Sequence, residues 1–137
     1  MAAFLSDELS LFLDTLSPFE WGVSDCCQMV TAWAAELAGQ HPSPEYICAY
    51  CDEAGAHAIL EQGGGIISLL GSVLRRAGFC ETEYAQRGDI GVVLTRTVNG
   101  EEPAAAICAG RRWVLTSATR LHFVRAEPLK VWTWPKR

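Results

Sequence analysis

The chain has 137 residues, of which 50% are hydrophobic and 20% are charged, and its formal net charge is −5. This length and composition predict one globular domain over residues 1–137 with a sizeable apolar core, and they exclude a disordered chain. The acidic balance argues against nucleic acid as a partner, because nucleic-acid binders usually present a basic surface. No apolar run is long enough to span a membrane, and the N-terminal MAAFLSDELSLF lacks the basic start of a signal peptide.

The first half of the chain shows helical spacing of apolar residues. A first helix is expected to end near Ser17-Pro18, and its apolar positions are Leu5, Leu9, Phe12, Leu13 and Leu16. A second helix is expected to begin at Asp25 or Cys26 and to end at Gly39. Its apolar stripe, which predicts a largely buried helix, consists of Cys26, Met29, Val30, Trp33, Ala34 and Leu37.

Two more helical regions follow the second helix. Ser43 as N-cap and Pro44 at the first helical position predict a third helix over residues 44–54, with Gly55 as its stop. A short helical piece is expected at residues 56–62. A fourth amphipathic helix, closed by a glycine, is indicated by the apolar set Ile66, Leu69, Leu70, Val73, Leu74 and Ala77.

The second half of the chain is rich in β-branched and apolar residues separated by turn dipeptides. These runs predict strands at residues 89–97, 104–109, 112–117, 121–124 and 129–134. Helices first and a mostly antiparallel sheet second is the order of an α+β fold.

Cysteine is frequent in this chain, at positions 26, 27, 48, 51, 80 and 108. With no signal peptide and enough length for an ordinary core, we expect free thiols and no disulfides. Cys48 and Cys51 form a CxxC pair, but no second pair of ligands stands at zinc spacing. Neither a metal site nor a redox motif is therefore expected, and no cofactor is predicted.

Cys26 is the candidate nucleophile. A thiol in the first turn of a helix lies near the positive end of the helix dipole, which favours the reactive thiolate. The carboxylate of Asp25 opposes this effect unless it is engaged in capping the helix. From this local feature alone a buried structural thiol is the commoner outcome, and Cys27 has the same two interpretations.

A cysteine nucleophile needs a base, which is usually histidine. The chain has three histidines, His41, His57 and His122. His122 is the best candidate, because a base on a strand can face the N-terminus of a helix. Strand alternation, however, points His122 away from Leu121 and Phe123, so it faces solvent if those two side chains face the core.

The order of these motifs resembles the NlpC-type cysteine peptidases: a Trp-Gly turn, Asp-Cys opening a helix, Arg-Gly-Asp-Ile entering a strand, and a strand ending in Gly. More closely, WGVSDCC, LAGQHP, GAHAILEQGGG, AQRGDIGVV, AICAG and VWTW look like a family of small phage and prophage domains, often encoded among tail genes. The likeness spans nearly the whole chain. It implies a papain-like fold, with helices packed on an antiparallel sheet and Cys26 at the nucleophile position. The residues it implies as supports of the site are Trp21, Gly22, Asp25, Gly88 and Asp89.

One position departs from the NlpC pattern. Those enzymes carry the catalytic histidine at the start of the strand that ends in Gly, and here that position falls at about Ala104. The third, polar member would follow near residues 114–116, where Arg112, Thr116 and Ser117 stand close by. We therefore expect no imidazole nitrogen within about 4 Å of the Cys26 sulfur, a little beyond hydrogen-bond reach.

Two functions follow from the resemblance. The first is a tail-associated component of a phage or prophage that keeps the fold as a structural or binding module with a degraded catalytic site. Its partners would be other tail proteins, and it would reside in the virion tail, or in the bacterial cytoplasm before assembly. The alternative is an active cysteine peptidase or amidase that acts on cell-wall peptides, with Cys26 as nucleophile and His122 as base.

Overall fold

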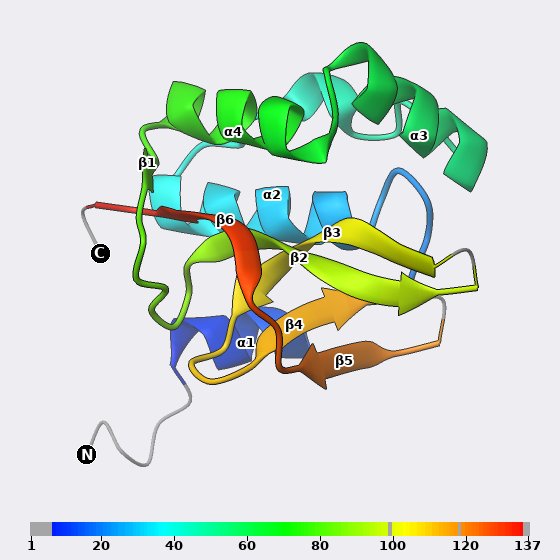
Figure 1. Cartoon of the computed structure of the whole chain (residues 1–137). Coiled ribbons are helices and arrows are strands. Elements are labelled where there is room, and N and C mark those ends of the chain that lie inside the picture. Colours follow the sequence, from blue (N-terminus) through cyan, green and yellow to red (C-terminus); the bar gives the residue numbers. More distant parts are fainter. Residues whose placement is uncertain (1–6, 99, 118, 136–137) are drawn as a thin grey trace.

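The computed structural model of the chain describes residues 7–98, 100–117 and 119–135 (Figure 1). Within these residues the fold is α+β, as the sequence predicts, with helices first and one antiparallel sheet second. The helices are α1 (Glu8–Asp14), α2 (Cys26–Ala38), α3 (Glu53–Gln62) and α4 (Ile66–Ala77), and a 3₁₀ turn, η2 (Pro44–Tyr46), precedes α3. The strands are β1 (Cys80–Glu81), β2 (Ile90–Thr97), β3 (Gly100–Cys108), β4 (Trp113–Thr116), β5 (Leu121–Val124) and β6 (Pro128–Thr133).

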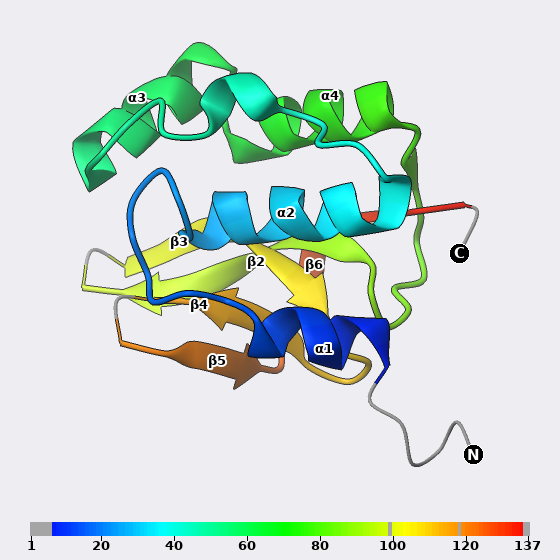
Figure 2. The same cartoon turned by 180° about the vertical axis from the view of Figure 1, so that it is seen from behind.

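The elements form layers around α2. Both views show α2 between the sheet and an outer layer of α3 and α4, with α1 on the side away from that layer (Figures 1 and 2). The sheet order is β1-β6-β2-β3-β4-β5, so the last strand inserts between the first two, and every ladder is antiparallel. No helix in the described residues is long and apolar enough to cross a membrane.

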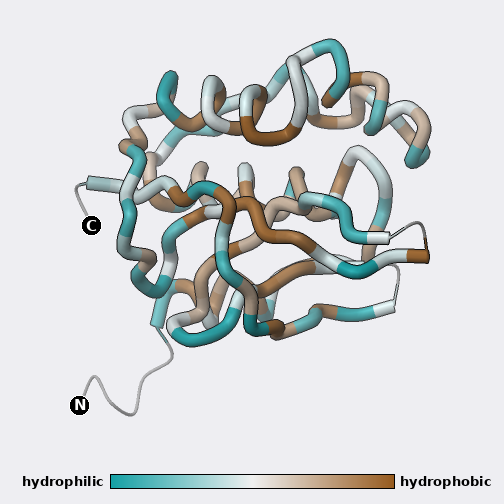
Figure 3. Tube along the Cα trace, viewed as in Figure 1, coloured by the Kyte–Doolittle hydropathy of each residue, from teal (hydrophilic) through white to brown (hydrophobic). Residues whose placement is uncertain are grey.

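Two apolar clusters hold the layers together. The larger one joins the inner sides of α2 and α4 to the sheet, and Figure 3 shows the apolar residues of α4 on the side that faces α2. The smaller cluster lies on strands β2, β3, β4 and β6 and consists of Val93, Ala106, Cys108, Trp113, Leu115 and Val131. Trp132 is fully buried in the larger cluster, and Trp134 packs against Phe79 at a tilt of 48°, with ring centroids 5.1 Å apart.

Helix α2 is the central element of the core, which confirms the prediction made from its apolar stripe. Val30 and Ala34 are fully buried, and Trp33 is 2% exposed. The indole Nε1 of Trp33 donates a hydrogen bond of 2.7 Å to the carbonyl of Gly88, the turn that leads into β2. The helix ends at Gly39, whose φ of 78° is the left-handed conformation expected at a C-cap.

The predicted third helix is wrong. Residues 44–52 form only the 3₁₀ turn Pro44–Tyr46, and Cys48 adopts a left-handed φ of 59° that an α-helix does not allow. The helix begins later, because the side chain of Asp52 accepts a hydrogen bond of 2.7 Å from the amide of Gly55. Gly55 therefore lies in the first turn of α3 instead of stopping a helix.

Smaller differences concern the ends of elements. The first helix spans Glu8–Asp14 with Asp7 as N-cap, and Leu5 of its expected stripe lies outside the described residues. Strand β3 begins at Gly100, earlier than predicted. The two-residue strand β1 was not predicted, because so short a segment carries no period-2 pattern; its pairing with β6 defines it.

Candidate functional site

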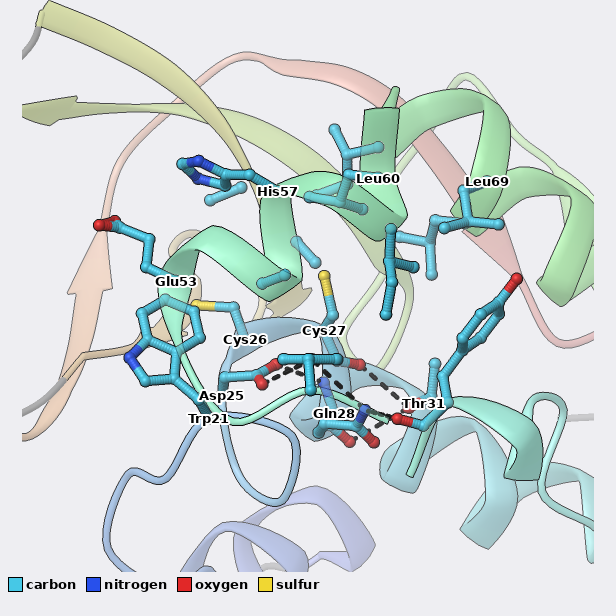
Figure 4. Close-up of a pocket in the computed structure, with 18 of the residues that line it drawn as sticks. Trp21, Asp25, Cys26, Cys27, Gln28, Thr31, Glu53, His57, Leu60 and Leu69 are labelled. Atoms are coloured by element: carbon cyan, nitrogen blue, oxygen red, sulfur yellow. Dashed lines mark hydrogen bonds between the residues drawn. The ribbon is translucent and has the colours of Figure 1, made fainter. Parts of the chain in front are cut away.

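A cavity of about 380 Å³ lies at the head of α2 (Figure 4). Its floor is the first turns of α2, its roof is α3 with the adjoining part of α4, and one side is formed by β3 and the end of β4. The roof is aliphatic: Ile59, Leu60, Ile66, Leu69, Leu70 and Val73. A volume of this size lies within the range of about 300–1,000 Å³ that is typical of small-ligand pockets.

Asp25 organises the floor of the cavity. Its side chain is 3% exposed and caps α2, with Oδ1 accepting from the amide of Gln28 at 3.0 Å. Its Oδ2 accepts from the amide of Gly22 at 2.7 Å and from the hydroxyl of Tyr50 at 2.6 Å. Burial, together with this hydrogen bond to Asp25, raises the pKa of Tyr50. One buried carboxylate thus joins the Trp21-Gly22 turn, the start of α2 and the loop before α3.

Gly22 has a steric reason to be glycine. Its φ is 81°, and a Cβ built on it would lie 2.2 Å from the carbonyl oxygen of Tyr50. Its own carbonyl accepts a hydrogen bond of 2.8 Å from the amide of Cys48. Trp21, the residue before it, lines the cavity and packs edge-on against Phe19 with ring centroids 4.9 Å apart. The predicted supporting residues Trp21, Gly22 and Asp25 therefore lie together at the site.

Cys26 is the first residue of α2, as predicted, and its side chain is half-buried. The sulfur donates a hydrogen bond of 3.0 Å to the carbonyl oxygen of Thr116 at the end of β4. Burial raises the pKa of Cys26 to about 11, and the negative charge of Asp25 raises it as well. At neutral pH the group is a protonated thiol, because the cost of desolvating the thiolate outweighs the benefit of the helix N-terminus.

Cys27 also belongs to the cavity. Figure 4 shows its sulfur pointing into the space below Leu60, whereas the sulfur of Cys26 points to the side, toward Trp21. Burial raises the pKa of Cys27, and the charge of Asp25 acts in the same direction. Cys27 is therefore a neutral thiol among apolar neighbours.

The three histidines are not hydrogen-bonded to the Cys26 sulfur within the described residues. His122 on β5 is half-buried, and its Nε2 lies 2.7 Å from the hydroxyl oxygen of Ser117. His57 on α3 is exposed and lines the cavity, whereas His41 accepts a hydrogen bond from Ser43 in the loop after α2. Within the described residues, no hydrogen bond joins an imidazole to the sulfur of Cys26.

The face of β5 differs from the arrangement considered for His122. Leu121 packs against the larger core cluster, but Phe123 is 49% exposed, so the two do not share a buried side. His122 is half-buried and bonded to Ser117, and it is not a freely solvated surface histidine. Ser117 and Thr116 both line the cavity, and these adjacent residues hydrogen-bond His122 and Cys26, respectively.

Ala104 lies on β3 and lines the same cavity as Cys26. It is half-buried and packs, like Cys26, against the smaller apolar cluster. The position at which the NlpC resemblance would put the base is therefore next to the cavity and holds a methyl group. An alanine can neither accept the thiol proton nor return it to a leaving group.

Gly88 and Asp89 support the site from a distance, since neither lines the cavity. The amide of Gly88 donates 2.7 Å to the carbonyl of Cys108, and its carbonyl accepts from Trp33. Asp89 is 1% exposed, and its Oδ1 accepts from the hydroxyl of Thr133 at 2.7 Å. This turn therefore ties α2, β3 and β6 together and sets the position of α2 on the sheet.

All six cysteines lie in the described ranges and are free thiols. Cys48, Cys51 and Cys80 are exposed. Among the described residues, no cluster of three or more histidine, cysteine, aspartate or glutamate side chains is arranged to hold a metal ion. The sequence did not predict that α3 forms the roof of a site. The adjacent apolar residues Ile59 and Leu60, on a helix with few other large apolar side chains, were a signal that this helix covers an apolar surface.

These features define an α+β protein in which a helix that begins with a cysteine packs on an antiparallel sheet. A largely apolar cavity lies over the first turns of this helix. The chain matches a family model described as "Domain of unknown function (DUF6950)" over residues 6–134, and it belongs to that family. No curated protein and no solved structure matches the chain.

Proposed function

We propose that this protein is a tail-associated component of a phage or prophage, with a papain-like, NlpC-type fold that serves as a binding module without catalytic activity. The resemblance in motif order, from WGVSDCC to VWTW, supports this assignment. The arrangement agrees with it, because a helix that begins at Cys26 lies against an antiparallel sheet beside β3 and β4. Its partners are other tail proteins, and it resides in the virion tail or, before assembly, in the bacterial cytoplasm.

The state of Cys26 is the observation that carries the absence of catalysis. A papain-like site works because an imidazole takes the thiol proton and later protonates the leaving amine. Here the thiol donates to the carbonyl of Thr116, its pKa is raised to about 11, and alanine stands at position 104 beside it. Within the described residues no imidazole is hydrogen-bonded to the Cys26 sulfur to perform either proton transfer.

The alternative function, a cysteine peptidase or amidase that acts on cell-wall peptides, has one observation in its favour. His122 is bonded to Ser117, which lines the same cavity as Cys26. Catalysis by this route requires the imidazole to leave Ser117 and contact the sulfur of Cys26 in place of the Thr116 carbonyl. An imidazole in contact with the sulfur would lower the pKa of Cys26, so the two functions predict different pH dependences for its alkylation.

Alkylation by iodoacetamide, followed residue by residue with peptide mass mapping, tests the two functions. At pH 7 a thiol of pKa about 11 is ionised in about one molecule in 10⁴, so the alkylation rate of Cys26 should rise about tenfold per pH unit up to pH 10. The exposed thiols of Cys48, Cys51 and Cys80 serve as internal references, because their alkylation shows that the iodoacetamide is active. A rate that is already at its plateau below pH 7 would show a thiolate of low pKa and would favour the hydrolase.

Hydrolysis provides the second arm of the test. The wild-type protein should not release peptide from muropeptides above the rate of the Cys26→Ala variant. Cys27→Ala is the matched control, since it removes a neighbouring thiol from the same helix turn. Turnover that depends on Cys26 and survives in Cys27→Ala would replace the binding module by an active hydrolase.

A further inference from the structure

The apolar side of α3 that forms the roof of the cavity is only partly covered by other residues of the chain. Helix α3 contains no buried residue, although its cavity side carries Ala56, Ile59 and Leu60. Leu60 also packs against the edge of the larger core cluster, but all three side chains border the cavity and keep only part of their surface from water. An occupant of the cavity would cover this apolar surface, and removing apolar surface from water is favourable.

The floor of the cavity presents polar groups without partners. Ser43 is 3% exposed, and its hydroxyl makes no hydrogen bond within the described part of the chain. Gln28 is 6% exposed; its Nε2 donates to the carbonyl of Tyr46 at 2.9 Å, while among the described residues its Oε1 accepts nothing. Within the described residues Nε1 of Trp132 is the one side-chain atom that is both fully buried and unbonded, so the Ser43 hydroxyl and the Gln28 Oε1 are open to the cavity and can hydrogen-bond an occupant.

The charges at the cavity have one sign. Three acidic residues line it, Asp25, Glu53 and Glu102, and no lysine or arginine of the described residues does. Asp25 is used by its three hydrogen bonds, which leaves Glu53 on α3 and Glu102 on β3. Figure 4 shows Glu53 beside His57 on one side of the cavity. This arrangement disfavours fatty acids and phosphates and suits an apolar ligand with a cationic group.

The apolar surface also continues outside the cavity. Pro103 lines the cavity and is the cross-strand partner of Leu94 on β2, which is 41% exposed. An occupant that follows this surface from α3 to the β2–β3 hairpin is longer than one small molecule. A polypeptide segment has this length and carries apolar and cationic side chains on adjacent residues.

We propose that the cavity seats an apolar side chain of a partner polypeptide, and that an adjacent lysine or arginine of the partner lies against Glu53 and Glu102. This inference rests on the proposed binding role and specifies the chemistry of the segment that is bound. Helix α3 is then the cover of the site, and Ser43 and Gln28 hydrogen-bond the backbone of the bound segment.

Labelled hexapeptides test the inference directly on the full chain. The probe is fluorescein-Gly-Ser-Phe-Lys-Ser-Gly, compared with one peptide that has Glu in place of Lys and another that has Ser in place of Phe. Fluorescence polarisation should show binding of the Phe-Lys peptide and at least about tenfold weaker binding of the other two. Equal binding of the Phe-Glu or the Ser-Lys peptide would overturn the proposed chemistry.

Variants locate the binding at the cavity. Ala56→Trp fills the cavity from α3 and should weaken binding of the Phe-Lys peptide by at least tenfold, with an unchanged circular dichroism spectrum. Glu53→Gln should weaken it about two- to fivefold, as expected for a solvent-screened charge, and this difference should vanish in 0.5 M NaCl. Glu61→Gln makes the same change on the same helix outside the cavity lining and should have no effect.

Three results would overturn the inference. One is full peptide affinity in Ala56→Trp, which would place the binding elsewhere. Another is equal loss in Glu53→Gln and Glu61→Gln, which would reduce the charge effect to the net charge of the protein. The third is no binding of any hexapeptide at millimolar concentration. The alkylation of Cys26 is measured separately, so the non-catalytic role stands or fails independently of these results.

Discussion

Helices α2 and α3 meet at the same cavity but are held in place very differently. Each begins at an aspartate whose side chain accepts a hydrogen bond from the third residue of the helix, Asp25 in α2 and Asp52 in α3. Yet α2 has six buried residues and α3 has none. The same kind of aspartate N-cap thus starts both helices. They differ in burial, which makes α2 part of the core and leaves α3 at the surface.

The two helices therefore differ in how firmly they are held. Helix α2 is fixed by its apolar stripe and by the bond from Trp33 to Gly88, so the residues at its head are held in one geometry. Helix α3 contacts α4 and the cavity, and few buried contacts oppose its displacement. Regions of this kind open at low free-energy cost and often serve as binding elements. The protein therefore combines a rigid floor with an adjustable cover.

The largest effect is expected at the anchor of α2. Trp33→Ala leaves a cavity in the core and removes the hydrogen bond to Gly88, so the free energy of unfolding should fall by about 3–5 kcal/mol. Trp33→Phe keeps much of the packing and should cost less. Urea unfolding measures both variants. A loss below about 1 kcal/mol in Trp33→Ala would show that α2 is not the rigid member of the pair.

Gly22 tests the connection between the head of α2 and the loop before α3. Gly22→Ala should destabilise the protein by at least about 2 kcal/mol, because strain at positive φ adds to the contact with the Tyr50 carbonyl. Gly39→Ala is the matched control: its φ is 78°, but no atom lies within 4 Å of the added Cβ. The difference between the two variants in chemical denaturation isolates the steric contact, and equal losses would mean that the loop moves away freely.

The sequence predicts the rigid part of the molecule well. The stripe around Met29 and Trp33, the α+β order and strand β5 all follow from periodic patterns, because burial on one side of an element imposes that period. The supporting roles of Gly22 and Asp25 came from the resemblance, and their contacts give these roles a physical basis.

The rest could not be read from local patterns. Residues 44–54 carry helix-start signals, but the left-handed Cys48 and the capping Asp52 delay the helix, and the competition between caps is settled by tertiary contacts. The raised pKa of Cys26 depends on its burial in the folded chain, which no spacing reveals. The cavity itself exists because two distant segments, β3 and α3, leave the space between them unfilled.

Leu60 measures how loosely α3 is held. Because Leu60 is only half-buried and already borders a cavity, Leu60→Ala should cost at most about 1 kcal/mol. Leu74→Ala on α4, at a fully buried position, is the counterpart and should cost about 2–5 kcal/mol. Denaturant midpoints at equal slope compare them. A similar loss for the two leucines would make α3 part of the core.

The smallest effect concerns α1, a helix fastened by a surface ion pair. Its N-cap Asp7 pairs with Arg87, the residue before the Gly88 turn that anchors α2, and the two side chains are 50% and 40% exposed. The hydrogen bond from Arg87, followed by that from the amide of Ser10, lowers the pKa of Asp7. Such a half-exposed pair contributes about 0.5 kcal/mol. Asp7→Asn keeps a capping side chain and removes the charge, so it isolates this contribution.

The sign of the pH dependence follows from the direction of the shift. A carboxyl whose pKa is lower in the folded state adds stability above its unfolded pKa of about 3.9, and this stability is lost as the pH falls below that value. The difference between wild type and Asp7→Asn should therefore be constant from pH 5 to 8, shrink below about pH 4, and decrease in 1 M NaCl. Unfolding curves at pH 7 and pH 3 measure it. A loss that exceeds about 1.5 kcal/mol, or that persists unchanged at pH 3, would mean that the Arg87 contact anchors the fold as strongly as the buried bond of Trp33.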